Sequence, residues 1–225
     1  RKIDNKYTYR IIFIPETIGA ITYLSKHLKE LKENVICGFN LTCVGDEGNY
    51  SFVNSRYGNS FADKVMKFSL TEMNKNFKEY SYIHRGSDER QFCSPGVDLP
   101  LVTFSRTLFG KFPEYHTSLD NLDFVSSKAL NESFEVMAKC LDIIEKNNKY
   151  LINTICEPQL GKRDLYPNIS EKGNYYLTKN LLNFISYADG TNDMLDICEI
   201  TKIDFNEALS IAEKLLKKDL LDIVN

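Results

Sequence analysis

Runs and spacings of apolar residues divide the first part of the chain into strands and helices. The segment TYRIIFIP, Thr8 to Pro15, is short, β-branched and nearly continuous in apolar content, which predicts a central strand buried on both faces. From Thr17 to Glu33 apolar residues recur every three and four positions with charges between them, which predicts a helix. This succession places Glu16 at the carboxyl end of the strand, just before the helix.

The following segments continue the alternation. Two β-like runs, residues 35–45 and 49–57, flank Asp46, Glu47 and Gly48, which are residue types of a turn, and this pattern predicts a hairpin. We further predict a helix over residues 61–77, a strand over 99–109 and a long amphipathic helix over 126–150. Strands that alternate with helices are typical of a layered α/β domain.

The composition changes between Glu157 and Asn174, where prolines and glycines are mixed with charged residues. We therefore expect a first domain over residues 1–157, a linker over 158–174 and a second domain over 175–225. The second domain contains three helical patterns and the closing strand-like run LLDIV. This order of elements predicts a winged helix.

The composition is that of an ordinary globular protein, since 43% of the 225 residues are hydrophobic, 26% are charged and the net charge is −3. This balance excludes disordered and fibrous classes and argues against a bulk affinity for nucleic acid or anionic membranes. The sequence has no apolar run long enough to cross a bilayer and no signal-peptide pattern, so we expect no membrane partner and a cytoplasmic location. The six cysteines lack the paired spacing of a cysteine-only zinc site and are expected to be buried, reduced thiols.

The charge of the second domain bears on its partners. Between Gly190 and Asn225 there are four lysines and eight acidic residues, and the expected recognition helix begins DFNEA. A DNA-binding winged helix needs positive charge against phosphate. We therefore expect no nucleic-acid partner, and we assign this domain to contacts with a protein partner or with a second copy of the chain in a homo-oligomer.

Ligand sites in α/β domains gather at the carboxyl ends of strands, which makes Glu16 a candidate. The alternative is a carboxylate that interacts with the dipole of the following helix. His116 follows the strand over 99–109 and has Glu114, Asp120 and Asp123 nearby, which are residues able to orient a metal-binding imidazole. A structural histidine is equally compatible with this context.

The remaining histidines and a charged loop are less specific. His27 lies in a charged helical stretch and is expected to be on the surface, whereas His84 is ambiguous in a loop. Asp88, Glu89 and Arg90 lie together in the loop GSDERQFCSPGVDLP. Such a loop is either a solvated turn or the rim of a substrate site.

Three separated motifs carry a resemblance to a known superfamily. IPETIGAI resembles the strand-end EExG segment of the zinc aminopeptidase superfamily, which also contains glutamate carboxypeptidases and glutaminyl cyclases. SDERQFCSPGVDLP resembles its SDHxxFxxxGxP loop, and YHTSLDNLD resembles its HTxxD motif. Nearly the whole chain resembles the C-terminal half of bacterial polysaccharide-biosynthesis-associated proteins with an aminopeptidase-like domain and a C-terminal winged helix. The implied fold is part of a three-layer α/β domain with a mixed sheet, followed by a small winged helix.

The resemblance implies roles for particular residues. Glu16 matches the general base that takes a proton from zinc-bound water, and His116 matches a zinc ligand. The loop that shapes the substrate pocket corresponds to Ser87, Asp88, Glu89 and Arg90.

Two positions depart from the pattern of the two-metal members. Thr17 stands where these members have a ligand glutamate, and Asn40 stands where a ligand aspartate is expected. A hydroxyl and an amide are poor zinc ligands. The sequence therefore predicts one zinc ion at most.

Superfamily members also supply a histidine and a bridging aspartate from an upstream segment that has no match here. We therefore expect the intact protein to carry an N-terminal portion that completes the site. The expected function is a zinc-dependent amide-bond hydrolase that acts on a small peptide or an acylated amino sugar. The alternatives are an inactive aminopeptidase-like scaffold or interaction protein and, with less support from the residues, a winged-helix DNA-binding regulator.

Overall fold

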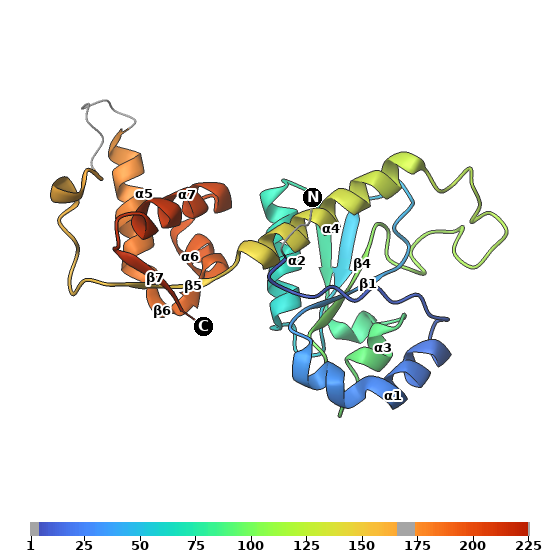
Figure 1. Ribbon diagram of the computed structural model, residues 1–225. Coiled ribbons are helices and arrows are strands. Elements are labelled where there is room, and N and C mark those ends of the chain that lie inside the picture. The colour runs from blue at the N-terminus through green and yellow to red at the C-terminus, as the bar shows by residue number, and fades with distance from the viewer. Residues whose placement is uncertain (1–4, 166–173, 225) are drawn as a thin grey trace. The chain divides into compact units, whose positions relative to one another are not determined.

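The computed structural model describes residues 5–165 and 174–224, which form two compact units that divide between Glu145 and Lys146 (Figure 1). Helix α1 of the first unit covers Ile18–Asn34, close to the range predicted for it. The elements that follow in this unit are β1 (Gly38–Leu41), β2 (Tyr50–Val53), α2 (Phe61–Glu72), β3 (Phe77–Tyr80), the 3-10 helix η1 (Tyr82–His84), α3 (Glu89–Phe92), β4 (Leu101–Ser105) and α4 (Ser127–Lys146).

Helix α2 begins as predicted but is shorter. A capping box between Ser60 and Asp63 begins the helix, because each side chain bonds the other residue's backbone amide. At the other end Asn74 has a positive φ of 51°, and the amide of Lys75 donates to the carbonyl of Leu70. This left-handed C-terminal turn stops the helix, and the chain continues into β3, a strand that the sequence pattern did not reveal.

The first unit contains a four-stranded mixed sheet in the order β1-β4-β2-β3. Strands β1 and β4 are parallel, as are β2 and β3, whereas β2 and β4 are antiparallel. The predicted hairpin is wrong, because β4 lies between β1 and β2. Two strands and a turn are encoded locally, but a strand much later in the sequence decides which edges pair.

Strand β4 separates the two sides of this sheet, as the alternation of its side chains requires. Leu101 packs against the core of α1 and α3, and Thr103 bonds Glu89 of α3. Val102 and Phe104 are buried on the opposite side, where α2 and α4 lie (Figure 1). The first unit therefore has three layers, and burial of each large apolar side chain contributes about 1.5–3 kcal/mol.

The segment from Thr8 to Pro15 is not the buried strand that was predicted. It is extended but has no strand assignment, and the side chains of Ile11 and Phe13 are 80% and 94% exposed. In the described part of the chain the backbone of residues 8–14 forms no backbone–backbone hydrogen bond. The prediction was wrong because apolar, β-branched residues favour a strand only where a neighbouring strand supplies partners.

The second unit is a small helical domain with a three-stranded sheet in the order β6-β5-β7, in which β5 pairs antiparallel with both neighbours. Two buried residues, Phe184 and Phe205, lie at the centre of its core. Its elements are β5 (Lys149–Ile152), the 3-10 helix η2 (Leu160–Arg163), α5 (Asn174–Tyr187), β6 (Asp189–Asp193), α6 (Met194–Thr201), α7 (Phe205–Leu216) and β7 (Leu221–Val224).

The two units divide earlier in the chain than the predicted domain boundary at residue 157. The predicted helix extended to residue 150, but residues 149–152 form β5 and pair with β6 and β7. The expected linker over 158–174 contains η2, and residues 166–173 lie outside the described part of the chain. None of the helices in the described ranges combines the length and the apolarity that a membrane span requires.

Candidate functional site

A pocket of about 280 Å³ lies at the carboxyl end of β1. Three segments that are distant in sequence contribute to it: the turn before α1, the loop after β1 and the long loop between β4 and α4. Its lining residues are Glu16, Thr42, Cys43, Gly45, Asp46, Phe112, Tyr115, His116, Asp120, Phe124 and Val125. Glu16 and His116, the two residues on which the hydrolase prediction depends, thus line the same hollow.

Glu16 lies in an unusual turn at the start of α1. Thr17 has φ 63° and ψ −68°, and the amide of Ile18 donates to the carbonyl of Glu16 at 2.7 Å. This is a γ-turn with a positive φ at a β-branched residue, a conformation that costs about 1–3 kcal/mol. The side chain of Glu16 is 57% exposed, and its Oε1 lies 3.6 Å from Nη2 of Arg90.

His116 lies in the long loop between β4 and α4, which contains no helix or strand. The imidazole is exposed and stacks on the ring of Tyr115 at 4.0 Å between centroids. Phe112 contacts the rings of both Tyr115 and Phe124, so aromatic side chains form one wall of the pocket. A loop of this length without regular structure is typical of binding sites.

The acidic residues near His116 do not hold its imidazole. Of the three carboxylates considered in the sequence, Asp120 lines the pocket with His116, whereas Glu114 and Asp123 do not. Within the described residues no hydrogen bond joins the imidazole to any of these carboxylates. The second-nitrogen contact expected for a metal-bound histidine is therefore not present in this structure.

The loop after β1 is held by backbone contacts from two later elements. The amide of Arg106 donates to the carbonyl of Cys43, and the hydroxyl of Ser133 donates to the carbonyl of Val44. The amide of Ser126 donates to the carbonyl of Gly45. These contacts tie the pocket wall to the end of β4 and to the start of α4.

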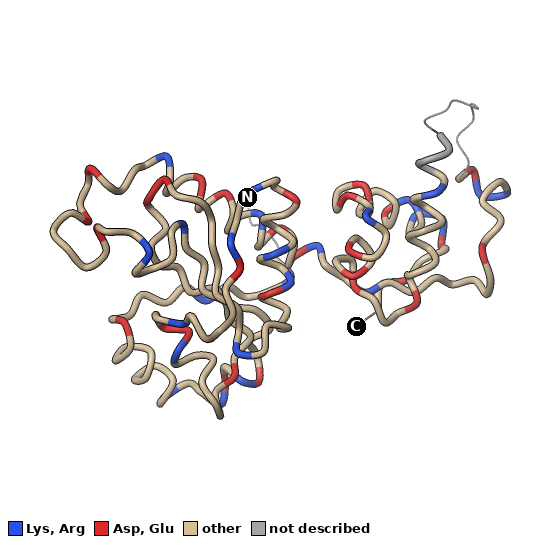
Figure 2. Tube along the Cα trace, turned by 180° about the vertical axis from the view of Figure 1, so that it is seen from behind, with Lys and Arg blue, Asp and Glu red and all other residues tan. Residues whose placement is uncertain are grey.

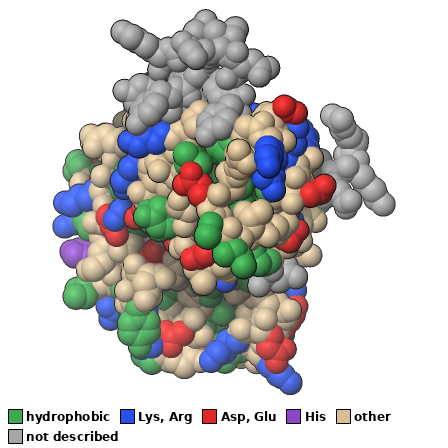
Figure 3. Space-filling model, turned by 90° about the vertical axis from the view of Figure 1, so that its left-hand side faces the viewer, with side chains coloured by type: hydrophobic (Ala, Val, Ile, Leu, Met, Phe, Trp, Pro, Cys, Tyr) green, Lys and Arg blue, Asp and Glu red, His purple; other side chains and the backbone are tan. Residues whose placement is uncertain are grey.

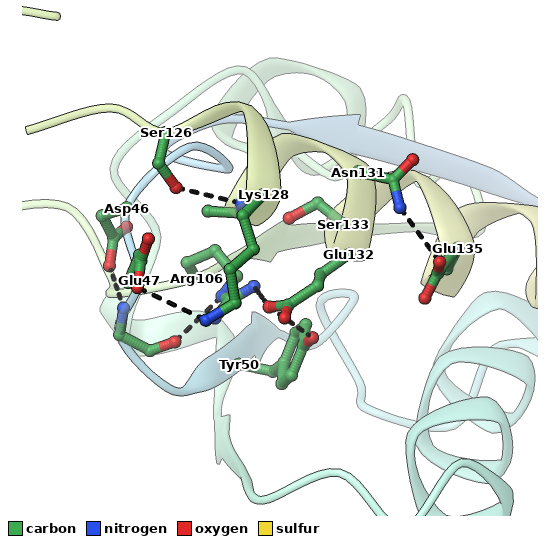
Figure 4. Close-up of polar contacts among 12 residues, drawn as sticks. Asp46, Glu47, Tyr50, Arg106, Ser126, Lys128, Asn131, Glu132, Ser133 and Glu135 are labelled. Atoms are coloured by element: carbon green, nitrogen blue, oxygen red, sulfur yellow. Dashed lines mark hydrogen bonds and ion pairs between the residues drawn. The ribbon is translucent and has the colours of Figure 1, made fainter.

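Side chains complete this attachment, as Figure 4 shows. Arg106 is buried and donates to Glu132 of α4 at 2.7 Å and to the carbonyl of Gly48 at 2.9 Å, and it lies over the ring of Tyr50. Asp46 is also buried and accepts bonds from the amide of Gly48 and from Thr107. The Asp46 carboxylate is thus engaged within the protein, although it borders the pocket.

The predicted substrate loop lies beside the Glu16 turn, outside the residues that line the pocket. Ser87, Asp88 and Glu89 are buried, and only Arg90 is partly exposed. Glu89 accepts bonds from the amides of Gly86 and Ser87 and from the hydroxyl of Thr103. These internal partners favour a structural role for the loop over direct substrate contact.

Two residues that line the pocket, Thr42 and Cys43, were not singled out by the sequence. Asn40, expected at a metal-ligand position, donates its amide to Glu89 and Thr103 inside the unit. Thr42, two residues later in the chain, lines the pocket instead, together with Cys43. The available signal was their place directly after β1, since carboxyl ends of strands carry ligand sites.

The thiol of Cys43 is not prepared for nucleophilic chemistry. Burial raises its pKa, and the carboxylates of Asp46, Asp120 and Glu16 raise it further against an opposing hydrogen bond from Thr42. Burial likewise raises the pKa of Tyr115, with Cys43 and Glu16 adding to the effect. A thiolate is the reactive form of cysteine, so a Cys–His nucleophile is not supported here.

The described residues do not by themselves make a zinc site. Among them, no three His, Cys, Asp or Glu side chains are grouped so that they could hold a metal ion. A catalytic zinc takes about three protein ligands. His116 offers one imidazole at the pocket, but residues 5–165 and 174–224 do not bring a complete set of three such side chains together.

The other two histidines lie outside the pocket. The ring of His27 contacts that of Tyr23 in a tilted arrangement, and its Nδ1 lies 3.4 Å from Glu30 on the surface of α1. The ring of His84 lies against that of Tyr80 near the end of β3, with the two rings tilted by 55°. Neither imidazole lines the pocket that contains Glu16.

The winged-helix unit carries mixed charge. Asp204 caps α7 by accepting bonds from the amides of Asn206 and Glu207, so carboxylates occupy the start of the expected recognition helix. Figure 2 shows acidic and basic residues interspersed along this unit, and Figure 3 shows both signs of charge scattered over the face of the molecule that it presents, which includes side chains of the first unit. This distribution does not resemble the basic surface that phosphate binding requires.

A curated protein and a crystal structure, both from Clostridium acetobutylicum, match almost the whole chain. One, assigned as a polysaccharide biosynthesis protein with an aminopeptidase-like domain, is 36% identical over 99% of this chain and 51% of its own length. A crystal structure of a protein assigned as a peptidase has a TM-score of 0.87 and 35% identity over 99% of this chain and 50% of its own. This chain therefore spans about half the length of these relatives. An aminopeptidase from Aneurinibacillus has a TM-score of 0.46 and 20% identity over 57% of this chain and 30% of its own, a likeness too distant to assign chemistry.

The fold and these relatives define the class: an aminopeptidase-like α/β domain with a mixed sheet, followed by a winged helix, as the sequence predicted. The model of a winged helix-turn-helix family matches residues 148–223. Residues 1–147 match the domain of unknown function DUF4910, and the chain belongs to that family.

Proposed function

We propose that this chain contributes to the active site of a zinc-dependent amide-bond hydrolase, with Glu16 as general base and His116 as one zinc ligand. The observation that carries the proposal is that these two side chains, distant in sequence, line one pocket. Both are exposed to the pocket and neither is packed in the core. A carboxylate and an imidazole at one pocket are the groups that metal-assisted hydrolysis uses.

The metal would supply only part of the chemistry. A bound zinc lowers the pKa of its water to about 7. Because the described residues offer His116 without a set of three ligands, further ligands have to come from elsewhere in the protein. The proposal therefore assigns this chain a base, one ligand and the walls of the substrate pocket.

The pocket supports a small substrate group. Its volume of about 280 Å³ is near the lower limit of ligand sites, which suits a single amino acid or sugar residue. Its aromatic wall suits an apolar or ring face, and Glu16 and Asp120 suit a polar or cationic group. We accordingly keep a small peptide or an acylated amino sugar as the substrate, and a cytoplasmic location stays a prediction.

A second candidate is an inactive aminopeptidase-like scaffold. It is favoured by Thr17, whose hydroxyl is bonded to Arg90 and replaces a ligand carboxylate. Through its winged helix the scaffold would contact a protein partner or a second copy of the chain. A DNA-binding regulator is not favoured, because carboxylates occupy the start of α7.

The test measures hydrolysis of a panel of aminoacyl and N-acetyl amino-sugar substrates, with zinc, by this chain and by the longer C. acetobutylicum relative. We expect turnover by the relative. Changing its counterpart of Glu16 to Gln should lower kcat by about 10²–10⁴-fold while zinc stays bound. Changing its counterpart of His116 to Ala should lower the zinc content measured by mass spectrometry.

The matched control is the counterpart of Glu114→Gln, which removes a nearby carboxylate that does not line the pocket. Equal turnover by the Glu16→Gln counterpart and the parent removes this residue from the mechanism. Bound zinc without turnover on any substrate favours the scaffold. Tight, stoichiometric zinc binding by this chain alone contradicts the statement that further ligands are needed.

A further inference from the structure

The turn that carries Glu16 differs from an ordinary start of a helix. A threonine at the N-cap normally accepts a bond from a first-turn amide, but in this structure Thr17 makes no such side-chain bond. Its backbone instead adopts a positive φ of 63°, which is unfavourable for a β-branched residue. Such strain persists only where surrounding groups hold it.

Two residues of the loop before and within α3 hold this turn. Asp88 is buried, and its Oδ1 accepts the amide proton of Thr17 at 2.7 Å. Arg90 donates from Nη2 to the hydroxyl of Thr17, also at 2.7 Å, and the same nitrogen lies 3.6 Å from Oε1 of Glu16. Hydrogen bonds that involve an ionised group are stronger than neutral ones, so both contacts can maintain a strained backbone.

The loop that holds the turn is itself anchored to the sheet. Glu89 has no exposed surface, and it accepts bonds from the amides of Gly86 and Ser87 and from the hydroxyl of Thr103 in β4. A continuous set of contacts therefore runs from the centre of the sheet to the pocket. Groups mounted on rigid elements in this way are held more accurately than groups on free loops.

We infer that Asp88 and Arg90 are positioning residues that hold the Thr17 turn and thereby keep the Glu16 carboxylate at the pocket. The Glu16 side chain is 57% exposed, so packing does not orient it. Its position depends instead on the Thr17 turn and on the nearby guanidinium of Arg90. The expected effect of Asp88 and Arg90 on catalysis rests on the proposed function. Their expected effect on the conformation of the Thr17 turn is independent of that function.

The conformational test is hydrogen exchange at the amide of Thr17, followed by NMR in this chain. The acceptor of this amide is the Asp88 carboxylate, so Asp88→Ala should accelerate exchange at least about tenfold. Asp88→Asn keeps a carbonyl acceptor and should restore part of the protection. The amides of Val102 and Phe104 in β4 report whether the fold is intact.

Arg90→Gln is the second variant, for the case that the Asp88 variants do not fold. The Arg90 side chain is 40% exposed, so we expect this variant to fold. It should also accelerate exchange at Thr17, by several-fold. The matched control, Asp98→Asn, removes the charge from the partly buried pair of Asp98 with Arg56 and should leave exchange at Thr17 unchanged. Unchanged protection of Thr17 in folded Asp88→Ala, or in Arg90→Gln if the Asp88 variants do not fold, overturns the inference.

The catalytic test uses the counterparts of Asp88→Asn and Arg90→Gln in the longer relative. A positioning role predicts a kcat lowered about tenfold or more with KM nearly unchanged. A raised KM with unchanged kcat contradicts this role and returns the loop to direct substrate binding. If the Glu16→Gln counterpart has no effect, the hydrolase proposal fails, while the exchange experiment still decides whether the turn is held as inferred.

Discussion

At the scale of single residues, the surroundings of Glu16 restrict which side chains the turn accepts. The amide of Gly19 donates to the carbonyl of Pro15 at 2.9 Å, which folds the chain back at the start of α1. A Cβ at Gly19 would lie 2.8 Å from Cβ of Ile14 and 2.9 Å from Cδ of Pro15. The close approach of these segments therefore requires glycine.

We predict that Gly19→Ala lowers the free energy of unfolding by about 1–3 kcal/mol, because the added methyl group has no space. Alanine has a higher helix propensity than glycine, so without this steric contact the same substitution would stabilise α1. Urea denaturation of the two proteins measures the difference. Ser25→Ala, an exposed change on the same helix, is the control and should change stability by less than about 0.5 kcal/mol. A Gly19→Ala variant as stable as the parent would show that the turn can relax.

At the scale of elements, Arg106 joins the pocket loop, the end of β4 and α4. Its guanidinium is buried and bonds both Glu132 and the carbonyl of Gly48. Lys128 and Glu47 form a second link between the same elements in Figure 4, but both side chains are largely exposed. Exposed pairs contribute little, whereas loss of a buried partner leaves polar groups unsatisfied.

Arg106→Met should lower the free energy of unfolding by about 2–4 kcal/mol, since Glu132 and the carbonyl of Gly48 lose their donor. Lys128→Met is the matched control and should cost less than about 1 kcal/mol. Thermal and urea denaturation of both variants at neutral pH measure the effects. Equal losses in the two variants would contradict the dominant role given to burial.

The stability difference between the parent and Arg106→Met should depend on pH because Glu132 is titratable. The hydrogen bond from Arg106, and then its charge, lower the pKa of Glu132 below its ordinary value of 4.5. A lowered pKa in the folded state stabilises the protein above the unfolded pKa, and this contribution is lost as pH falls through the folded pKa. The stability difference between the parent and Arg106→Met should therefore shrink below about pH 4.5. A constant difference between pH 7 and pH 3 would argue against this coupling.

At the scale of the whole molecule, the segment from Thr8 to Ile14 leaves the side chains of Ile11 and Phe13 exposed, and its backbone forms no backbone–backbone hydrogen bond in the described part of the chain. Polar side chains attach this segment: the hydroxyl of Tyr9 donates to Glu145, and Arg10 donates to Glu30 and to the hydroxyl of Tyr23. Just before it, Glu145 also accepts the amides of Lys6 and Tyr7. Extended apolar segments with free backbone groups promote association with other chains.

We expect the double change Ile11→Lys and Phe13→Lys to reduce concentration-dependent self-association of this chain, because both side chains are almost fully exposed. Sedimentation velocity over a range of concentrations measures the effect. Ile83→Lys is the control, since Ile83 is 81% exposed in the separate helix η1. Association that persists in the double variant, or that falls equally in the control, contradicts a specific role for the segment.

The sequence alone was sufficient for features that depend on neighbouring residues. The apolar spacing from Thr17 to Glu33 predicted α1, and the resemblance motifs singled out Glu16 and His116, which line one pocket. It failed where the outcome depends on distant partners. The buried state predicted for Thr8–Pro15 and the pairing of β1 with β2 both require a particular strand alongside, and periodicity does not specify which strand that is.

By itself, then, the sequence determined the layered α/β class with its winged helix and the acidic character of the last helices, because periodicity and charge are properties of short segments. Only the tertiary structure decided that β4 separates β1 from β2. It also decided that Asp88 and Arg90 form hydrogen bonds with Thr17 and that Thr42, rather than Asn40, borders the pocket. These outcomes depend on packing between residues far apart in the chain, where the free energy of a contact is set by its surroundings.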